Sequence, residues 1–155
     1  WCSVGRHMRM ALDGGDMMVW AYLATPFVAW LVAGVLKFAI NSLKAGRPAF
    51  GLIGYGGLPS NHSAIVSSTA ALIALREGVG HPSFGVALTL AFIVVLDASS
   101  LRRQVGQHAE ALNQLREPHA APLRERIGHS RLEIAAGVAV GAAVAYGMQW
   151  FGGSH

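Results

Sequence analysis

A histidine stands at the start of an apolar, Ser- and Ala-rich run, in the stretch Gly-Leu-Pro-Ser-Asn-His-Ser at 57–63. If a helix begins there, its N-terminus carries roughly +0.5 charge and unsatisfied N–H groups, which can hold a phosphate. The imidazole of His62 could then exchange protons with that phosphate. The alternative is structural, with Ser60 capping the helix after a turn at Pro59 and His62 facing lipid headgroups. This stretch by itself fits both interpretations.

A second histidine precedes the last apolar run, in Gly-His-Ser-Arg-Leu-Glu at 128–133. Ser130 and Glu133 have the spacing of a capping box, so a helix should start here. Glu133 also lies one helical turn after His129, and its carboxylate can hold the imidazole in one tautomer. A histidine oriented in this way is a competent nucleophile toward phosphorus. Glu133 could equally act as a cap alone.

Basic residues near the end of the first apolar segment are candidate phosphate ligands. Lys37, Asn41 and Lys44 are spaced i, i+4 and i+7, so they share one side of a helix. Lys37 lies inside the apolar run, where a charge is costly unless it faces a polar cavity or reaches the membrane surface. Arg47 follows in the loop, and its guanidinium can bind phosphate through two parallel hydrogen bonds.

Asp97 ends the third apolar segment and is followed closely by Arg102 and Arg103. The carboxylate could simply pair with an arginine, or it could aim that arginine at a substrate. Adjacent residues cannot both face the same way on a helix, so at most one arginine should point into a site. His108 and Glu110 suggest a metal site only weakly, because no second ligand pair has suitable spacing. We therefore predict no metal.

The composition indicates a membrane protein. The chain of 155 residues is 53% hydrophobic and only 13% charged, which is too apolar for an ordinary soluble domain of this size. Residues 19–40 and 132–151 are long enough to cross a bilayer, whereas 63–75 and 84–98 need extra turns from the residues before them. We predict an all-α integral membrane helical bundle with about four spans. A soluble helical protein with a buried core is the competing interpretation.

A further helix is predicted in the long loop before the last span. Leu101, Val105, Leu112 and Leu115 recur at helical intervals and form a narrow apolar stripe. We expect an interfacial amphipathic helix that continues the third span along the membrane surface.

We predict one membrane-embedded domain over residues 17–155, preceded by an N-terminal tail at 1–16. The chain opens with Trp1 rather than Met, so we expect residues 1–10 to be the remainder of a truncated N-terminus or to derive from a vector. The apolar segment that follows is longer than that of a cleaved signal peptide.

Basic residues gather on one face of the predicted topology. With alternating spans, eight Lys and Arg residues fall on the face of the candidate site and three on the face of both termini. The positive-inside rule makes the first face cytoplasmic, so we predict a multi-pass protein of the cell membrane with its site toward the cytoplasm. The basic residues lie mainly in loops between apolar segments, which points to anionic lipid or a phosphorylated substrate rather than nucleic acid.

Gly137 and Gly141 form a small-xxx-small pair in the last span, where another helix can approach closely. The partner is either a helix of the same chain or a second copy in a homodimer, and the sequence leaves both open.

Together these residues resemble a known family. The chain resembles the divergent branch of the type 2 phosphatidic acid phosphatase family, which is related to bacterial acid phosphatases and vanadium-dependent haloperoxidases. The resemblance covers residues 32–141 and is most specific at 56–64, 97–113 and 128–137. The wider family has three motifs: Lys, six residues, Arg-Pro; Pro-Ser-Gly-His; and Ser-Arg, five residues, His, three residues, Asp.

Two cations of these motifs are displaced in this chain. Arg47 matches the end of the first motif, but Ile40 occupies its lysine position. Lys37 or Lys44 must serve instead, and we prefer Lys37 as the more constrained. Leu123 occupies the arginine position of the third motif, so one of the two adjacent arginines after Asp97 would supply that charge from across an inserted loop.

The histidines of the motifs are both present. The second motif falls on 59–62, with Asn61 in place of glycine, and the third falls on His129 and Glu133, with Glu in place of Asp. The resemblance implies that His129 attacks phosphorus to form a phosphohistidine and that His62 protonates the leaving group. It also implies that lysine and arginine side chains, with the region of Ser60 and Asn61, hold the phosphoryl oxygens without a metal or cofactor.

The expected function is therefore hydrolysis of a membrane lipid phosphate: phosphatidate, phosphatidylglycerophosphate, or a polyprenyl phosphate or diphosphate. The alternative is a non-catalytic membrane protein that binds anionic headgroups or a partner protein, which the Asn61 and Glu133 replacements motivate. Vanadate-dependent halide oxidation has no separate support in the sequence.

Overall fold

The computed structural model describes residues 2–46, 48, 57–115, 121–125 and 127–152. Within these residues every regular element is a helix, which confirms the all-α prediction. In chain order they are α1 (Cys2–Ala45), α2 (Asn61–Arg76), α3 (Pro82–Leu96), the π-helical segment η2 (Asp97–Leu101), α4 (Arg102–Gln114) and α5 (Arg131–Gly152).

Polar caps decide where two of the helices begin. The Ser60 hydroxyl accepts a hydrogen bond from the Ser63 N–H at 3.3 Å, so α2 starts directly after it. At α5, the Ser130 N–H donates to Glu133 Oε2 at 2.8 Å and the Glu133 N–H donates to Ser130 Oγ at 3.2 Å. This reciprocal pair is the predicted capping box.

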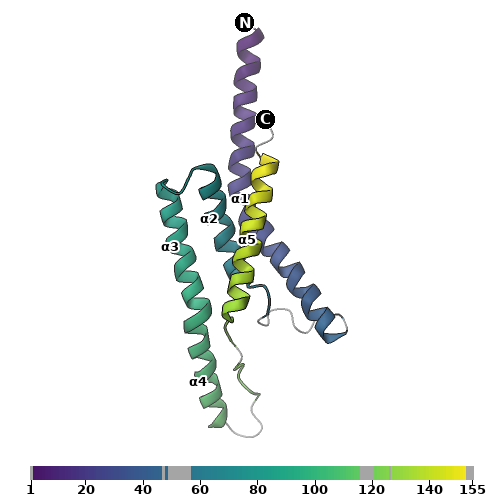
Figure 1. Cartoon of the computed structure of the whole chain (residues 1–155), viewed down its shortest axis with the longest axis vertical. Coiled ribbons are helices and arrows are strands. Elements are labelled where there is room, and N and C mark those ends of the chain that lie inside the picture. The colour runs from purple at the N-terminus through teal and green to yellow at the C-terminus, as the bar shows by residue number, and fades with distance from the viewer. Residues whose placement is uncertain (1, 47, 49–56, 116–120, 126, 153–155) are drawn as a thin grey trace.

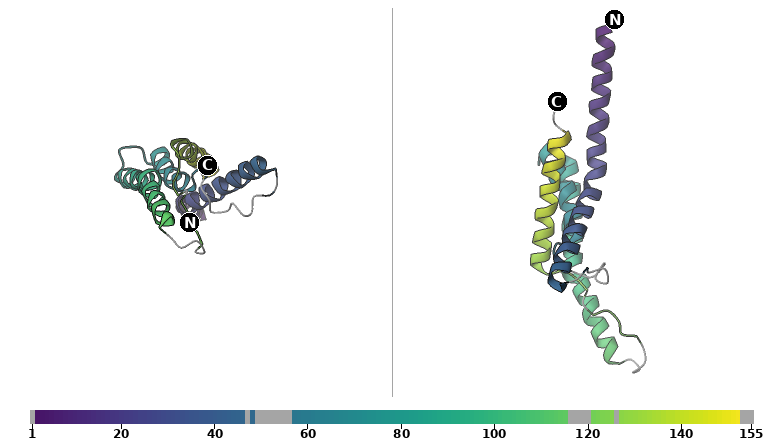
Figure 2. Two further views of the ribbon diagram at one scale, coloured as in Figure 1. Left: turned by 90° about the horizontal axis from the view of Figure 1, so that it is seen from below. Right: turned by 90° about the vertical axis from the view of Figure 1, so that its right-hand side faces the viewer.

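Helix α2 lies in the middle of the bundle and packs against α5, α1 and α3 (Figures 1 and 2). α3, η2 and α4 follow one another as a single rod that extends past the bundle, and both chain termini lie at the opposite end (Figure 1). The chain reverses direction between α1 and α2, between α2 and α3, and again between α4 and α5, so α2 and α5 run the same way (Figure 1). The first residues of α2 and of α5 therefore lie at the same end, beside η2.

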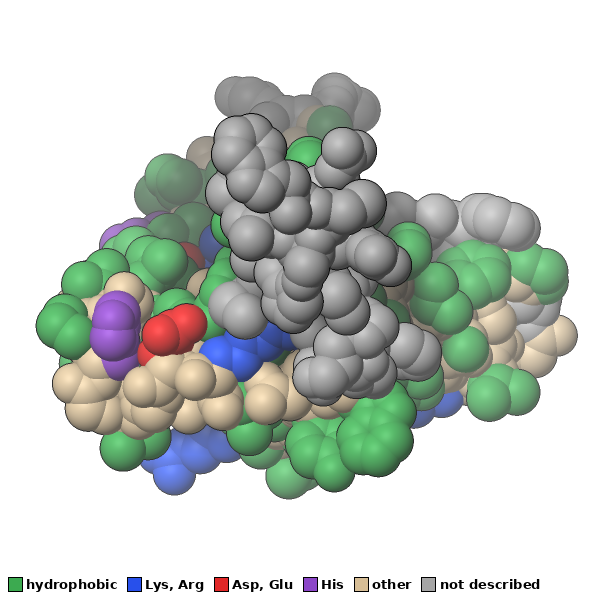
Figure 3. All heavy atoms as spheres, turned by 90° about the horizontal axis from the view of Figure 1, so that it is seen from above, with side chains coloured by type: hydrophobic (Ala, Val, Ile, Leu, Met, Phe, Trp, Pro, Cys, Tyr) green, Lys and Arg blue, Asp and Glu red, His purple; other side chains and the backbone are tan. Residues whose placement is uncertain are grey.

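Small residues fill the interior and large apolar residues face outward. Among the described residues, the buried hydrophobic side chains are alanines apart from Leu72. Phe27 is 71% exposed, Trp30 54% and Phe92 63%, and hydrophobic side chains cover much of the described surface in the view down the long axis (Figure 3). Helices in a bilayer pack through small residues and turn bulky apolar ones to the lipid, so this arrangement is that of a membrane protein.

Three helical stretches of the described residues are long and apolar enough to cross a membrane: Val19–Ala45, Pro82–Gln114 and Arg131–Trp150. The stretch Pro82–Gln114 joins the predicted third span, at 84–98, to η2 and α4. α2 has 16 residues, about 24 Å of helix, and is shorter than a hydrocarbon core of about 30 Å. α2 packs against α1, α3 and α5, which reduces its contact with lipid.

Two further predictions concern the N-terminal segment and the amphipathic helix. Helix α1 begins at Cys2, so the described part of the predicted N-terminal tail at 1–16 is helical and continuous with the first span. α4 continues the third span as predicted, and all four residues of its expected apolar stripe are exposed.

The two glycines of α5 pack against α2 of the same chain. A Cβ added to Gly137 would collide with the Ser60 carbonyl oxygen, and one added to Gly141 would collide with Ser67 Oγ and the Ala64 carbonyl oxygen. This face is therefore occupied within the chain and is not open to a second copy. Of the two alternatives, internal packing is observed, and a homodimer through the Gly137/Gly141 face is not.

We expect Gly141→Val to lower the midpoint of thermal unfolding in detergent, because overpacking of this kind costs about 1–3 kcal/mol. Gly147 lies on the same helix with nothing within 4 Å of an added Cβ, so Gly147→Val is the matched control and should unfold near the wild-type temperature. Equal midpoints for the two variants would contradict the close packing of α5 on α2.

Candidate active site

Two histidines from distant parts of the chain lie together at one end of the bundle. His62 is the second residue of α2, His129 lies just before α5, and their ring centroids are 6.3 Å apart. A hydrogen bond of 2.9 Å from the Ser60 N–H to the Glu133 carbonyl oxygen joins the two helix starts. Both rings can reach one phosphoryl group, because attack begins about 3–3.5 Å from phosphorus and proton donation needs about 2.6–3.2 Å.

His129 is held on two sides. Its Nδ1 lies 3.2 Å from Glu133 Oε2, and its backbone N–H donates to the Ala98 carbonyl oxygen at 3.0 Å. The side chain is only 8% exposed. Because the same Glu133 oxygen also accepts from Ser130, one carboxylate both caps α5 and contacts the imidazole. The contact uses Nδ1 and leaves Nε2 as the nitrogen that could attack a substrate.

The surroundings favour a neutral His129. Burial of the imidazole is the largest effect and lowers the pKa of His129 below its usual value of 6.5. The hydrogen bond that the imidazole donates to the Glu133 carboxylate opposes that shift, while the positive charges of Lys37 and Arg102 add to it. A neutral ring keeps the lone pair that a nucleophile needs.

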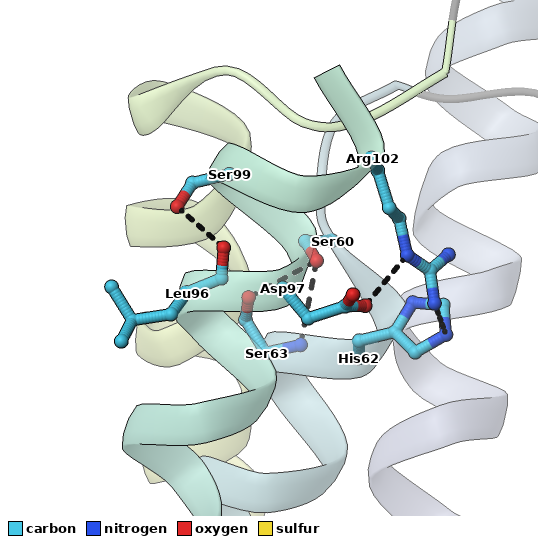
Figure 4. A network of polar contacts seen from close by, with 7 residues as sticks. All are labelled: Ser60, His62, Ser63, Leu96, Asp97, Ser99 and Arg102. Atoms are coloured by element: carbon cyan, nitrogen blue, oxygen red, sulfur yellow. Dashed lines mark hydrogen bonds and ion pairs between the residues drawn. The ribbon is translucent and has the colours of Figure 1, made fainter. Parts of the chain in front are cut away.

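Arg102 reaches from the start of α4 to the other histidine (Figure 4). Its Nε donates to Asp97 Oδ2 at 2.9 Å, and its Nη2 lies 3.5 Å from His62 Nε2. The Asp97 pairing therefore turns the guanidinium toward His62, so both of the roles considered for this carboxylate are compatible with one geometry. The neighbouring Arg103 is exposed, as expected if only one of the two faces the site.

The π-helical segment η2 makes this pairing possible. Residues five apart on an α-helix lie about 140° apart around the axis. In η2 the Arg102 N–H donates to the Asp97 carbonyl oxygen, five residues back, and this wider turn brings the two side chains to one side. The wide turn also lies where the Ala98 carbonyl accepts from His129. Neither the π turn nor the bond to Ala98 was predicted, because no residue pattern in the sequence marks a π turn.

The two lysines proposed for the first motif are placed differently. Lys37 is half-buried and acts electrostatically on His129, whereas Lys44 is exposed near the end of α1. Of the two lysines, the geometry thus favours Lys37 as the one that takes the place of the first-motif lysine. Arg47, the remaining predicted cation, lies outside the described residues.

Ser60 is a buried helix cap, and Asn61 faces α1. The Ser60 hydroxyl is fully buried and accepts from the Ser63 N–H at 3.3 Å and from Ser63 Oγ at 3.0 Å. We had expected it to bind phosphate, but its use as a helix cap places it in the interior. The Asn61 Nδ2 lies 3.7 Å from the position of a Cβ on Gly34, so this side chain faces α1. Within the described residues, no three His, Cys, Asp or Glu side chains gather as a metal site would require.

Comparison with known proteins places this chain in a family. The family model described as the divergent PAP2 family matches residues 19–144, a range that contains every site residue named above. The chain belongs to the divergent PAP2 family. The uncharacterized membrane protein YuiD of Bacillus subtilis (strain 168) is 32% identical over 94 residues, which is 60% of this chain and 60% of that relative's length. No solved structure matches the chain.

For this divergent PAP2 protein we expect Arg102→Ala to weaken binding of orthovanadate, a phosphate analogue, by about tenfold or more. Hydrogen bonds to charged groups contribute about 1.5–3 kcal/mol. Arg103→Ala removes the same charge one residue away and should change the affinity less than about twofold, by the weak screened effect of an exposed charge. Isothermal titration in detergent measures both. Equal losses in the two variants would show that the charge matters and its position does not.

Proposed function

We propose that this protein is a membrane phosphatase that hydrolyses a lipid phosphate through a phosphohistidine intermediate. The observation that carries the proposal is the pair of imidazoles 6.3 Å apart, with Glu133 against one ring and Arg102 against the other. Membership of the divergent PAP2 family supports the same reaction class.

In the first step, Nε2 of His129 attacks phosphorus and the bond from phosphorus to the lipid oxygen breaks. His62 gives a proton to that oxygen, so the lipid leaves as an alcohol. In the second step, water attacks the phosphohistidine, His62 takes the water's proton, and the bond from phosphorus to His129 breaks to release phosphate. Each histidine returns to its starting state.

Arg102 and Lys37 supply positive charge for the phosphoryl oxygens, where negative charge builds up during transfer. The Arg102 Nη2 lies 3.5 Å from His62 Nε2. The guanidinium can donate a hydrogen bond to His62 Nε2 only when that nitrogen is unprotonated and has a lone pair. A bound phosphate would draw the guanidinium to its own oxygens and leave Nε2 free to carry the proton for the leaving group.

The position of the site suits a lipid substrate. His62 and His129 lie beside the first residues of α2 and α5, so a phosphate bound there would lie at headgroup level with its acyl or prenyl chains in the bilayer. Phosphatidate, phosphatidylglycerophosphate and polyprenyl phosphates or diphosphates all have this form. We assign the site to the cytoplasmic face of the cell membrane on the charge of its loops.

The test is phosphate release from each of these lipids in detergent with a chelator present. His129→Ala should abolish release, and His62→Ala should lower kcat by about 10²–10⁴, the usual contribution of a general acid. His108 is an exposed histidine of α4, so His108→Ala is the matched control and should retain wild-type activity. Lipid binding without turnover would identify a headgroup-binding protein instead, and release that survives His129→Ala would exclude the phosphohistidine.

The pH dependence tests the role of Glu133. A nucleophilic His129 must be neutral, so kcat/KM should fall as the pH drops through its pKa. Glu133 raises that pKa, and Glu133→Gln should therefore move the acid limb of the profile to lower pH while reducing kcat. Glutamine can still close the capping box, so α5 keeps its start. Glu110→Gln, on the exposed surface of α4, should leave the limb in place. A shift to higher pH would contradict the assigned contact.

A further inference from the structure

We propose that Asn113 is a positioning residue for His129, acting through the segment that precedes the histidine, of which the structure describes residues 121–125 and 127–128. The kinetic part of this proposal rests on the proposed phosphatase function, and the structural part does not. Asn113 lies near the end of α4 and touches neither histidine.

The Asn113 carboxamide holds this segment at Leu123 and Glu125. Its Nδ2 donates to the Leu123 carbonyl oxygen at 2.9 Å, and its Oδ1 accepts from the Leu123 N–H at 2.8 Å. Nδ2 also donates to Glu125 Oε1 at 2.8 Å. One side chain thus bonds both backbone groups of Leu123, in a stretch that has no helix or strand of its own to order it.

Two glycines continue the contact along α4. A Cβ on Gly106 would collide with the Glu125 carbonyl oxygen, so only glycine lets the segment lie against the helix there. Gly128 has φ +111° and lies with its Cβ position 3.3 Å from the Arg103 nitrogen. The segment therefore runs back along α4 from Asn113 past Gly106 to η2, where His129 bonds Ala98.

This path explains how His129 is positioned from its N-terminal side. The capping box and Glu133 fix the chain that follows the histidine, while Asn113 and Gly106 fix the chain that precedes it. Asparagine suits the first task, because aspartate would have no N–H for the Leu123 carbonyl and would face the Glu125 carboxylate. Misplacement of a reacting group by about 1 Å can lower a rate 10²-fold.

The experiment measures the reactivity of individual histidines toward diethyl pyrocarbonate in the full-length protein in detergent, with the modified peptides identified by mass spectrometry. In the wild type, His129 should react slowly because its side chain is 8% exposed. In Asn113→Ala its rate should rise at least threefold, while His62 keeps its wild-type rate. Gln114 is the exposed neighbour on α4, so Gln114→Ala is the matched control and should change neither rate.

Phosphatase kinetics supply the second readout. Asn113→Ala should lower kcat about 10- to 100-fold with KM within twofold. The reason is that the variant should displace the His129 imidazole from the reacting phosphorus without weakening substrate binding. Asn113→Asp should be impaired as well, and adding Glu125→Gln should recover part of the loss by removing the opposed carboxylate. A gain in His129 reactivity without turnover in any variant, wild type included, would uphold positioning and overturn the phosphatase. An unchanged His129 rate, or an equal rise at His62, would overturn the positioning role.

Discussion

The close approach of α5 to α2 determines where the parts of the site lie relative to one another. Gly137 and Gly141 put no side chain between the helices, so α5 rests against the backbone of α2. The Ser60 N–H can then donate to the Glu133 carbonyl oxygen at 2.9 Å. His62 and His129 each lie within a few residues of that bond, and their separation follows from helix packing rather than from a loop. Between helices in a bilayer there is little hydrophobic driving force, so packing of small residues has to hold this contact.

The charged groups around the histidines are arranged in pairs of opposite sign. Arg102 pairs with Asp97 at 2.9 Å, both about one-third exposed, and Glu133 contacts His129. At the edge of a membrane an unpaired charge is costly, and pairing lowers that cost without burying the groups completely. Lys37 adds a further positive charge near His129. A phosphate dianion entering between the rings would meet the positive charges of Arg102 and Lys37, which are the electrostatic basis of the proposed chemistry.

The sequence predicts the helices well because each has a strong local cause. Long apolar runs indicate the spans, and Ser60 and Ser130 mark the starts of α2 and α5. Other features have no such cause. The choice between Arg102 and Arg103 depends on the register of α4, and the π turn that sets this register depends on contacts with the chain before α5. The buried position of Ser60 was also undecided, since a serine before a helix can cap it or bind an anion.

By itself, the sequence determined that this is an all-α membrane protein, that it resembles the divergent PAP2 family, and which two histidines are candidates for chemistry. These conclusions rest on composition and on spacing along the chain, which are local properties. Only the tertiary structure decided that the two histidines are neighbours and that Arg102 rather than Arg103 reaches His62. It also decided that the α5 glycines pack against α2 and not against a second copy. Each of these depends on how helices far apart in the chain pack, and packing geometry cannot be read from residues one at a time.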